Sequence, residues 1–178
     1  DEVETVRKDV ERLVRTSNDE NRRILETARK LIKEVREKNK EVTDRVRDLL
    51  RRIEEEVKKV KDKELKDRLK KKIDEVRERV ERLHKEIKDE LKEILDELER
   101  LSTELKEKNK KVLKEVEDAG VDERILEEIR RRVEENKKRS DESLKEAREL
   151  LRDVERESDE TLKEIEEEAR RLKEEIDR

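Results

Sequence analysis

The chain has 178 residues, of which 62% are charged and 28% hydrophobic, and its 53 basic and 57 acidic residues give a net charge of −4. Cys, Met, Pro, Phe, Tyr, Trp and Gln are all absent, which excludes disulfides, thiolate chemistry and stacking of nucleic-acid bases on aromatic rings. The apolar share is close to the two positions in seven of a narrow helical seam, so we expect a soluble all-α protein without a wide globular core.

The first predicted helix covers about residues 2 to 60. Its apolar positions recur about every eighteen residues, as in Val6, Ile24, Val42 and Val60. Eighteen residues are five turns of an undistorted α-helix, so the pattern predicts a nearly straight helix with one buried stripe and little supercoil. The step from Val60 to Leu65 turns the stripe by roughly 140°. A turn that ends at Asp62, the expected N-cap of the next helix, resolves this change of face.

The second predicted helix, about residues 63 to 118, repeats the interval through Leu65, Leu83, Leu101 and Ala119. It ends before Gly120, the single glycine, which suits a C-cap that needs positive φ. Asp122 is then the expected N-cap of a third helix, about residues 122 to 177. Loops this short place consecutive helices antiparallel, so the sequence predicts one domain over residues 1–178, an up-down-up three-helix bundle.

Polar side chains at stripe positions are the candidates for a role beyond apolar packing. Folding the chain at the two turns places a third-helix residue level with the first-helix residue about 116 positions earlier. Asn21, Ser102, Asn136 and Ser140 then share one layer, which Ser17, Asn109 and Ser143 extend. A second layer contains Asn39, His84 and Ser158, with Thr161 beside it. We expect two buried hydrogen-bond networks that specify helix register and pairing.

His84 is the sole histidine and therefore the best single candidate for a functional group. It could act as a metal ligand, a proton relay or a pH switch. The alternative is a neutral imidazole that bridges Asn39 and Ser158 within the second layer. One histidine without a second histidine or a cysteine makes a weak metal site at most, so we favour the structural role and expect no metal and no cofactor.

The remaining charged groups favour no enzymatic function. Carboxylates such as Glu54 to Glu56 and Glu166 to Glu168 lie off the stripe, where solvent-facing acids have no reason to be catalytic. The basic run Lys70 to Lys72 has no aromatic neighbour and is expected to be solvated, so no nucleic-acid partner is predicted. No apolar run approaches the roughly 18 residues of a membrane span, and no signal peptide is recognisable, which leaves the cellular location open.

The eighteen-residue repeat, the seven missing residue types, the lone loop glycine and the Asn, Ser and His layers together carry a resemblance. The chain resembles de novo designed single-chain helical bundles, generated parametrically, with buried hydrogen-bond networks. This resemblance covers the whole chain and implies a structural scaffold that has no native ligand and no catalytic residues.

Two other functions stay open. In a designed switch or binding module, a partner helix would displace the third segment, which carries the small residues Ala147, Ala169, Ser140, Ser143 and Ser158. A natural spacer similar to spectrin-type repeats would be expected to use aromatic core residues, which this chain lacks.

We expect a monomer that requires no partner. A homodimer is the alternative, because the stripe widens at pairs such as Leu49 with Leu50, Ile94 with Leu95, and Leu150 with Leu151.

Overall fold

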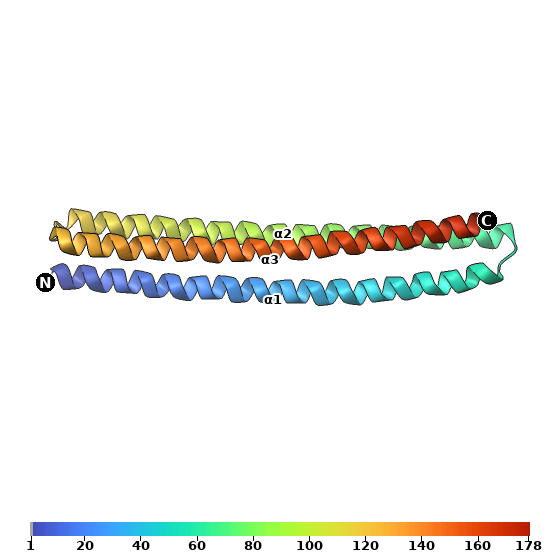
Figure 1. The fold of residues 1–178 in the computed structure, drawn as a ribbon, viewed down its shortest axis with the longest axis horizontal. Helices are drawn as coiled ribbons and strands as arrows, with labels where there is room; N and C mark the ends of the chain where they lie inside the picture. Colours follow the sequence, from blue (N-terminus) through green and yellow to red (C-terminus); the bar gives the residue numbers. More distant parts are fainter. Residues whose placement is uncertain (1) are drawn as a thin grey trace. The chain divides into compact units, whose positions relative to one another are not determined.

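The structure, a computed structural model, describes residues 2–178, with side chains described from residue 3 onward, and it consists of three long helices (Figure 1). Helix α1 is Glu2–Lys59, α2 is Lys63–Asp118 and α3 is Glu123–Asp177, and the described residues contain no strand. Glu, Lys, Arg and Leu, which dominate all three, are strong helix formers. Within the described part of the chain, none of the helices has an apolar stretch that could cross a membrane.

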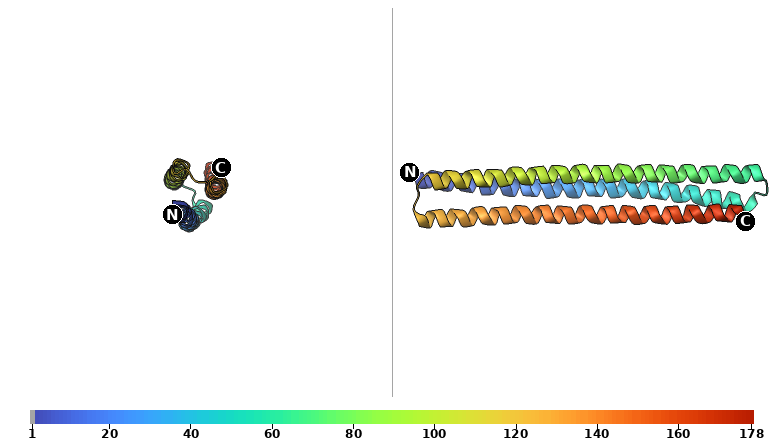
Figure 2. Two further views of the ribbon diagram at one scale, coloured as in Figure 1. Left: turned by 90° about the vertical axis from the view of Figure 1, so that its left-hand side faces the viewer. Right: turned by 90° about the horizontal axis from the view of Figure 1, so that it is seen from above.

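Figure 2 gives two further views of the three helices. The contacts divide the chain into two compact units, and each takes one stretch from every helix. Unit 1 comprises Asp1–Leu31 and Glu93–Leu150, and unit 2 comprises Ile32–Lys92 and Leu151–Arg178. Each unit is thus a three-helix assembly in its own right, although all of its segments belong to helices that continue into the other unit. The single-domain organisation over residues 1–178 stays a prediction.

Side-chain pairs define the helix directions inside each unit. In unit 1, Ser17 and Asn21 of α1 bond Asn136 and Ser140 of α3 in the same order, so these two stretches run in the same direction. In unit 2 the pairs of α1 with α3 also rise together, Arg36 with Glu157 and Arg47 with Glu164. The pairs of α2 with α3 run in opposite order in both units, namely Glu99 with Arg148 and Glu117 with Arg130 in unit 1, and Lys70 with Asp177 and Lys88 with Glu155 in unit 2.

Each unit has its own apolar core, built from the aliphatic stripe of the three helices. In unit 1 one buried cluster comprises Val6, Val10, Leu13, Val116, Ile129 and Val133. In unit 2 one buried cluster comprises Val46, Leu50, Ile53, Leu69, Ile73, Val76, Val80, Ile165, Ala169, Leu172 and Ile176. Burial of one such large side chain stabilises the folded state by about 1.5 to 3 kcal/mol, so these stripes supply the main driving force for association of the helices.

One stripe assignment is wrong. Leu65 continues the eighteen-residue pattern but is 43% exposed, whereas Leu69, one turn later, is 4% exposed. Leu65 lies in the first turn of α2, next to the loop that connects it to α1. The buried stripe of α2 therefore begins at Leu69.

The loops place the predicted cap residues at the helix ends, with a side-chain capping bond at Asp62 and a backbone bond at Asp122. The Asp62 carboxylate accepts a hydrogen bond from the backbone N–H of Glu64 (3.3 Å), and its carbonyl accepts from Lys66 (3.1 Å), which is N-cap geometry. Gly120, two residues after the end of α2 at Asp118, has φ of +64°. The Asp122 carbonyl accepts the first bond of α3 from the N–H of Leu126 (2.9 Å).

Replacing Gly120 isolates the cost of its backbone conformation, because a Cβ at this position would meet no atom within 4 Å. We expect Gly120→Ala to lower the free energy of unfolding by about 1 kcal/mol, since an alanine must adopt a left-handed conformation there. Gly120→Asn is the matched control and should cost less, because asparagine tolerates this region. Urea denaturation of the three proteins measures the difference, and an alanine variant as stable as the parent would contradict the argument.

Candidate functional site

Asn136 is the centre of a buried polar cluster in unit 1, where its side chain is 2% exposed. Its Nδ2 donates to the hydroxyl of Ser17 on α1 (2.9 Å) and to Oδ1 of Asn109 on α2 (2.9 Å). One amide therefore connects all three helices of the unit. Ser17 and Asn109 are themselves buried, at 0% and 3% exposure.

A second set of bonds extends this cluster one turn along the axis. Asn21 Nδ2 donates to the Ser140 hydroxyl (3.2 Å), and that hydroxyl donates to the backbone carbonyl of Asn136 (3.1 Å). The unit-1 polar cluster is therefore defined by Ser17, Asn21, Asn109, Asn136 and Ser140. Every member is buried, so the cluster can be broken only by separating the helices or shifting their register.

The register differs from the expectation. Asn136 bonds Ser17 and not Asn21, and both bonded pairs of α1 with α3 are separated by 119 residues where about 116 was predicted. The helix ends account for this shift. If the end of α1 at Lys59 is level with the start of α2 at Lys63, and the end of α2 at Asp118 is level with the start of α3 at Glu123, the offset between α1 and α3 becomes 119 residues. This is about three residues more than predicted.

The unit-1 polar cluster is only partly satisfied. Asn136 Oδ1 and Asn109 Nδ2 are both buried without a hydrogen-bond partner among the described residues. One is an acceptor and the other a donor on facing amides. A buried polar atom without a partner costs about 1 to 3 kcal/mol, so the cluster favours one register without maximising stability.

Ser102 and Ser143, the other predicted members, make no side-chain hydrogen bond within the described part of the chain. Ser102 is 5% exposed and its Oγ is unpartnered. Ser143 is half-buried. The structure therefore places both in unit 1 but does not connect them to the cluster around Asn136.

His84 forms a different arrangement in unit 2, with both ring nitrogens engaged by α3. Nδ1 lies 2.9 Å from the Ser158 hydroxyl, and Nε2 lies 2.8 Å from Oδ1 of Asp159. The predicted bridge from Ser158 to Asn39 is therefore wrong, because the imidazole turns its second nitrogen toward a carboxylate at the surface. Lys88 also approaches Asp159 (3.5 Å), so this carboxylate lies between two nitrogen groups of α2.

Asn39 and Thr161 lie near His84 without bonding to it. Both line a small cavity together with His84 and Ser158. The Thr161 hydroxyl donates to the Glu157 carbonyl of its own helix (2.9 Å). The second predicted layer thus gathers at one place, but its hydrogen bonds reach His84, Ser158 and Asp159 only.

Sequence reasoning missed Thr43 and Asp159. Thr43 is 7% exposed and lines the same cavity. Its position gave a usable signal, since it lies four residues after Asn39 and three before Val46 and so shares their face. Asp159 gave none, because it is one of many acidic residues and only the structure shows that it meets His84.

The described residues contain no group of three His, Cys, Asp or Glu side chains arranged to hold a metal ion. Lys70 lies at the surface of unit 2, next to Asp177. Its amine donates a hydrogen bond to the Asp177 carboxylate, and this bond raises the pKa of Lys70 above its ordinary value. The interaction favours the ammonium form and does not form an acid or base poised for neutral pH.

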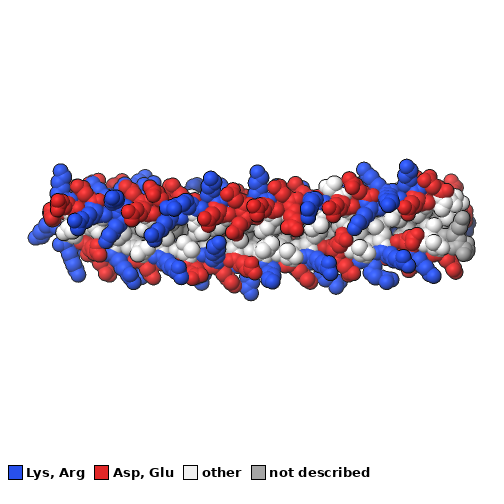
Figure 3. All heavy atoms as spheres, turned by 180° about the vertical axis from the view of Figure 1, so that it is seen from behind, with Lys and Arg blue, Asp and Glu red and all other residues white. Residues whose placement is uncertain are grey.

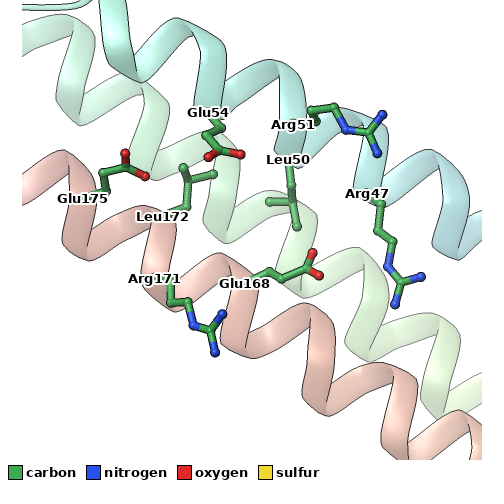
Figure 4. Close-up of a pocket in the computed structure, with 8 residues that line it drawn as sticks. All are labelled: Arg47, Leu50, Arg51, Glu54, Glu168, Arg171, Leu172 and Glu175. Carbon is green, nitrogen blue, oxygen red and sulfur yellow. The ribbon is translucent and has the colours of Figure 1, made fainter.

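A surface groove of about 340 Å³ lies between α1 and α3 in unit 2. Leu50 and Leu172 lie at its base and charged side chains stand around them, namely Arg47, Arg51, Arg171, Glu54, Glu168 and Glu175 (Figure 4). Three guanidinium and three carboxylate groups cancel in charge, so the groove has no net field to attract an ion. On the face shown in Figure 3, basic and acidic side chains are interleaved beside a band of other residues.

Comparison with known proteins identifies the fold. A solved structure described as a computationally designed three helix bundle matches with a TM-score of 0.51 and 20% sequence identity, over 99% of this chain and 86% of that chain. The chain has a three-helix-bundle fold. No protein-family model and no curated protein matches the sequence.

Truncating Asn136 tests whether the unit-1 polar cluster acts as a unit. We expect Asn136→Ala to lower the free energy of unfolding by about 2 to 4 kcal/mol, because it leaves the Ser17 and Asn109 groups buried without their donor. The triple variant Ser17→Ala, Asn109→Leu, Asn136→Leu should recover most of that loss, since no polar atom of the trio remains. Denaturant titrations measure both, and a triple variant that is less stable than Asn136→Ala would refute this account.

Proposed function

We propose that the chain is a designed structural scaffold without native biochemical activity, in which the buried polar clusters specify helix register and pairing. The observation that carries the proposal is the position of the polar side chains. Asn136 links three helices through one amide, at a site where apolar side chains would stabilise the fold at least as well. The likeness to a designed bundle and the restricted residue palette support a designed origin.

The ion pairs between helices at the surface of the described structure fit a scaffold. Ion pairs such as Arg29 with Glu146 and Arg148 with Glu99 connect neighbouring helices at the surface, each at 2.7 Å. Exposed pairs of this kind contribute about 0 to 1 kcal/mol each, so they favour correct neighbours more than they add stability.

We further propose that the chain works as a monomer and requires no nucleic acid, membrane or cofactor.

The proposal predicts that removing the polar layers affects uniqueness more than stability. In a variant with Ser17, Asn21, Asn109, Asn136 and Ser140 all replaced by Ala or Leu according to volume, we expect equal or higher resistance to denaturant. We also expect several species, visible as doubled amide peaks in NMR spectra or as mixed masses in light scattering, because apolar layers tolerate shifted registers.

A matched control carries five substitutions at exposed positions of unit 1 and should behave as the parent. If the layer variant gives a single set of peaks at monomer mass, the polar residues do not specify register, and the proposed function is contradicted. A parent chain that is itself a stable dimer would instead favour the homodimer alternative.

A displaceable α3 is the second candidate function, and one observation favours it. Helix α3 contributes to every bond that crosses between helices in both polar clusters, through Asn136, Ser140 and Ser158. Departure of α3 would therefore open both clusters at once. A switch of this type predicts fast amide hydrogen exchange confined to α3, whereas the scaffold predicts similar protection for the buried stretches of all three helices.

A further inference from the structure

The small cavity in unit 2 is bordered by all three helices and by five polar side chains. Asn39 and Thr43 line it from α1, His84 from α2, and Ser158 and Thr161 from α3. The rest of its wall is aliphatic. The cavity leaves about 10 Å³ in which the centre of a water molecule can lie. That space suits a single water and nothing larger.

Two polar groups that line the cavity, the Asn39 amide and the Thr43 hydroxyl, have no hydrogen-bond partner among the described residues. His84 uses both ring nitrogens for Ser158 and Asp159. The Thr161 hydroxyl donates to a backbone carbonyl of its own helix. By contrast, the Asn39 amide and the Thr43 hydroxyl form no bond to another described residue. The Thr43 residue is 7% exposed, and its side chain lines the cavity.

We infer that this cavity is a binding site for one ordered water molecule, which bridges Asn39 and Thr43 of α1 to the hydroxyls of α3. Water supplies what the lining requires, because it can donate and accept at once. Asn39 offers two donors and one acceptor, Thr43 offers one donor and one acceptor, and Ser158 and Thr161 retain acceptor lone pairs. Two to four polar partners are typical of a buried structural water.

The cavity lining disfavours an ion as the occupant. Its side chains include no carboxylate and no lysine or arginine, so neither a metal ion nor an anion would find a counter-charge within it. The water would connect α1 to the pair of His84 and Ser158 and so replace the direct bond between Asn39 and His84 that the sequence predicted. The polar layer of unit 2 would then span three helices, as the Asn136 amide does in unit 1.

Water-to-protein magnetisation transfer in NMR tests the site directly. We expect cross-peaks from water to the Asn39 side-chain amide and the Thr43 methyl group, with the sign of a long-lived bound water. A high-resolution crystal structure should place a density peak within hydrogen-bond distance of both side chains. Absence of the cross-peaks together with absence of the density peak would overturn the inference, and so would a direct bond between Asn39 and His84 that closes the cavity.

Two isosteric variants separate the bound water from a general effect of losing a hydroxyl. Thr43→Val should weaken the water cross-peak at Asn39 and raise the equilibrium constant for unfolding about five- to tenfold, because the water loses one of its partners. Thr103→Val is the control, since that exposed hydroxyl bonds the Glu99 carbonyl of its own helix and should change the constant by about twofold at most. A Thr43→Val protein with an undiminished Asn39 cross-peak would contradict the bridging role.

Discussion

A helix whose apolar side chains form only a narrow stripe cannot bury that stripe by itself, and this constraint governs the rest of the structure. The eighteen-residue interval keeps the stripe on one face of helices that are 58, 56 and 55 residues long. Since charged residues flank the stripe on both sides, three helices can cover one another without a wider core. Small side chains such as Ala28, Ala147 and Ala169, each 0% exposed, let the backbones approach closely.

Polar residues within the stripe add specificity to an association that aliphatic residues alone would leave loosely defined. A Leu or Val stripe tolerates a shift of one turn, because the same types of side chain then meet again. The amide of Asn136 tolerates no such shift, since its donors would meet Leu or Val in place of Ser17 and Asn109. The unpartnered Oδ1 of Asn136 and Nδ2 of Asn109 show that this specificity has a cost in stability.

The polar candidates could be named from the sequence, but their partners could not. Asn136 and Ser17 stand out because each interrupts an aliphatic pattern, and Thr43 could have been found by the same rule. The hydrogen bond between Asn136 and Ser17 depends on the height of α3 relative to α1. This height changes when the helix ends shift by about three residues. His84 contacts Asp159 and not Asn39 because of the rotation of its side chain, which the eighteen-residue spacing does not specify.

The sequence by itself determined the helices, their ends and the face that each one buries. These properties are local, because periodicity, an N-cap aspartate such as Asp62 and a glycine with positive φ act within a few residues of the chain. Only the tertiary structure decided which polar atoms meet, that Leu65 is exposed, and that Asn39 and Thr43 face a common cavity. The physical reason is that hydrogen bonds act over about 3 Å, whereas a helix rises about 1.5 Å per residue, so a shift of two residues changes every partner.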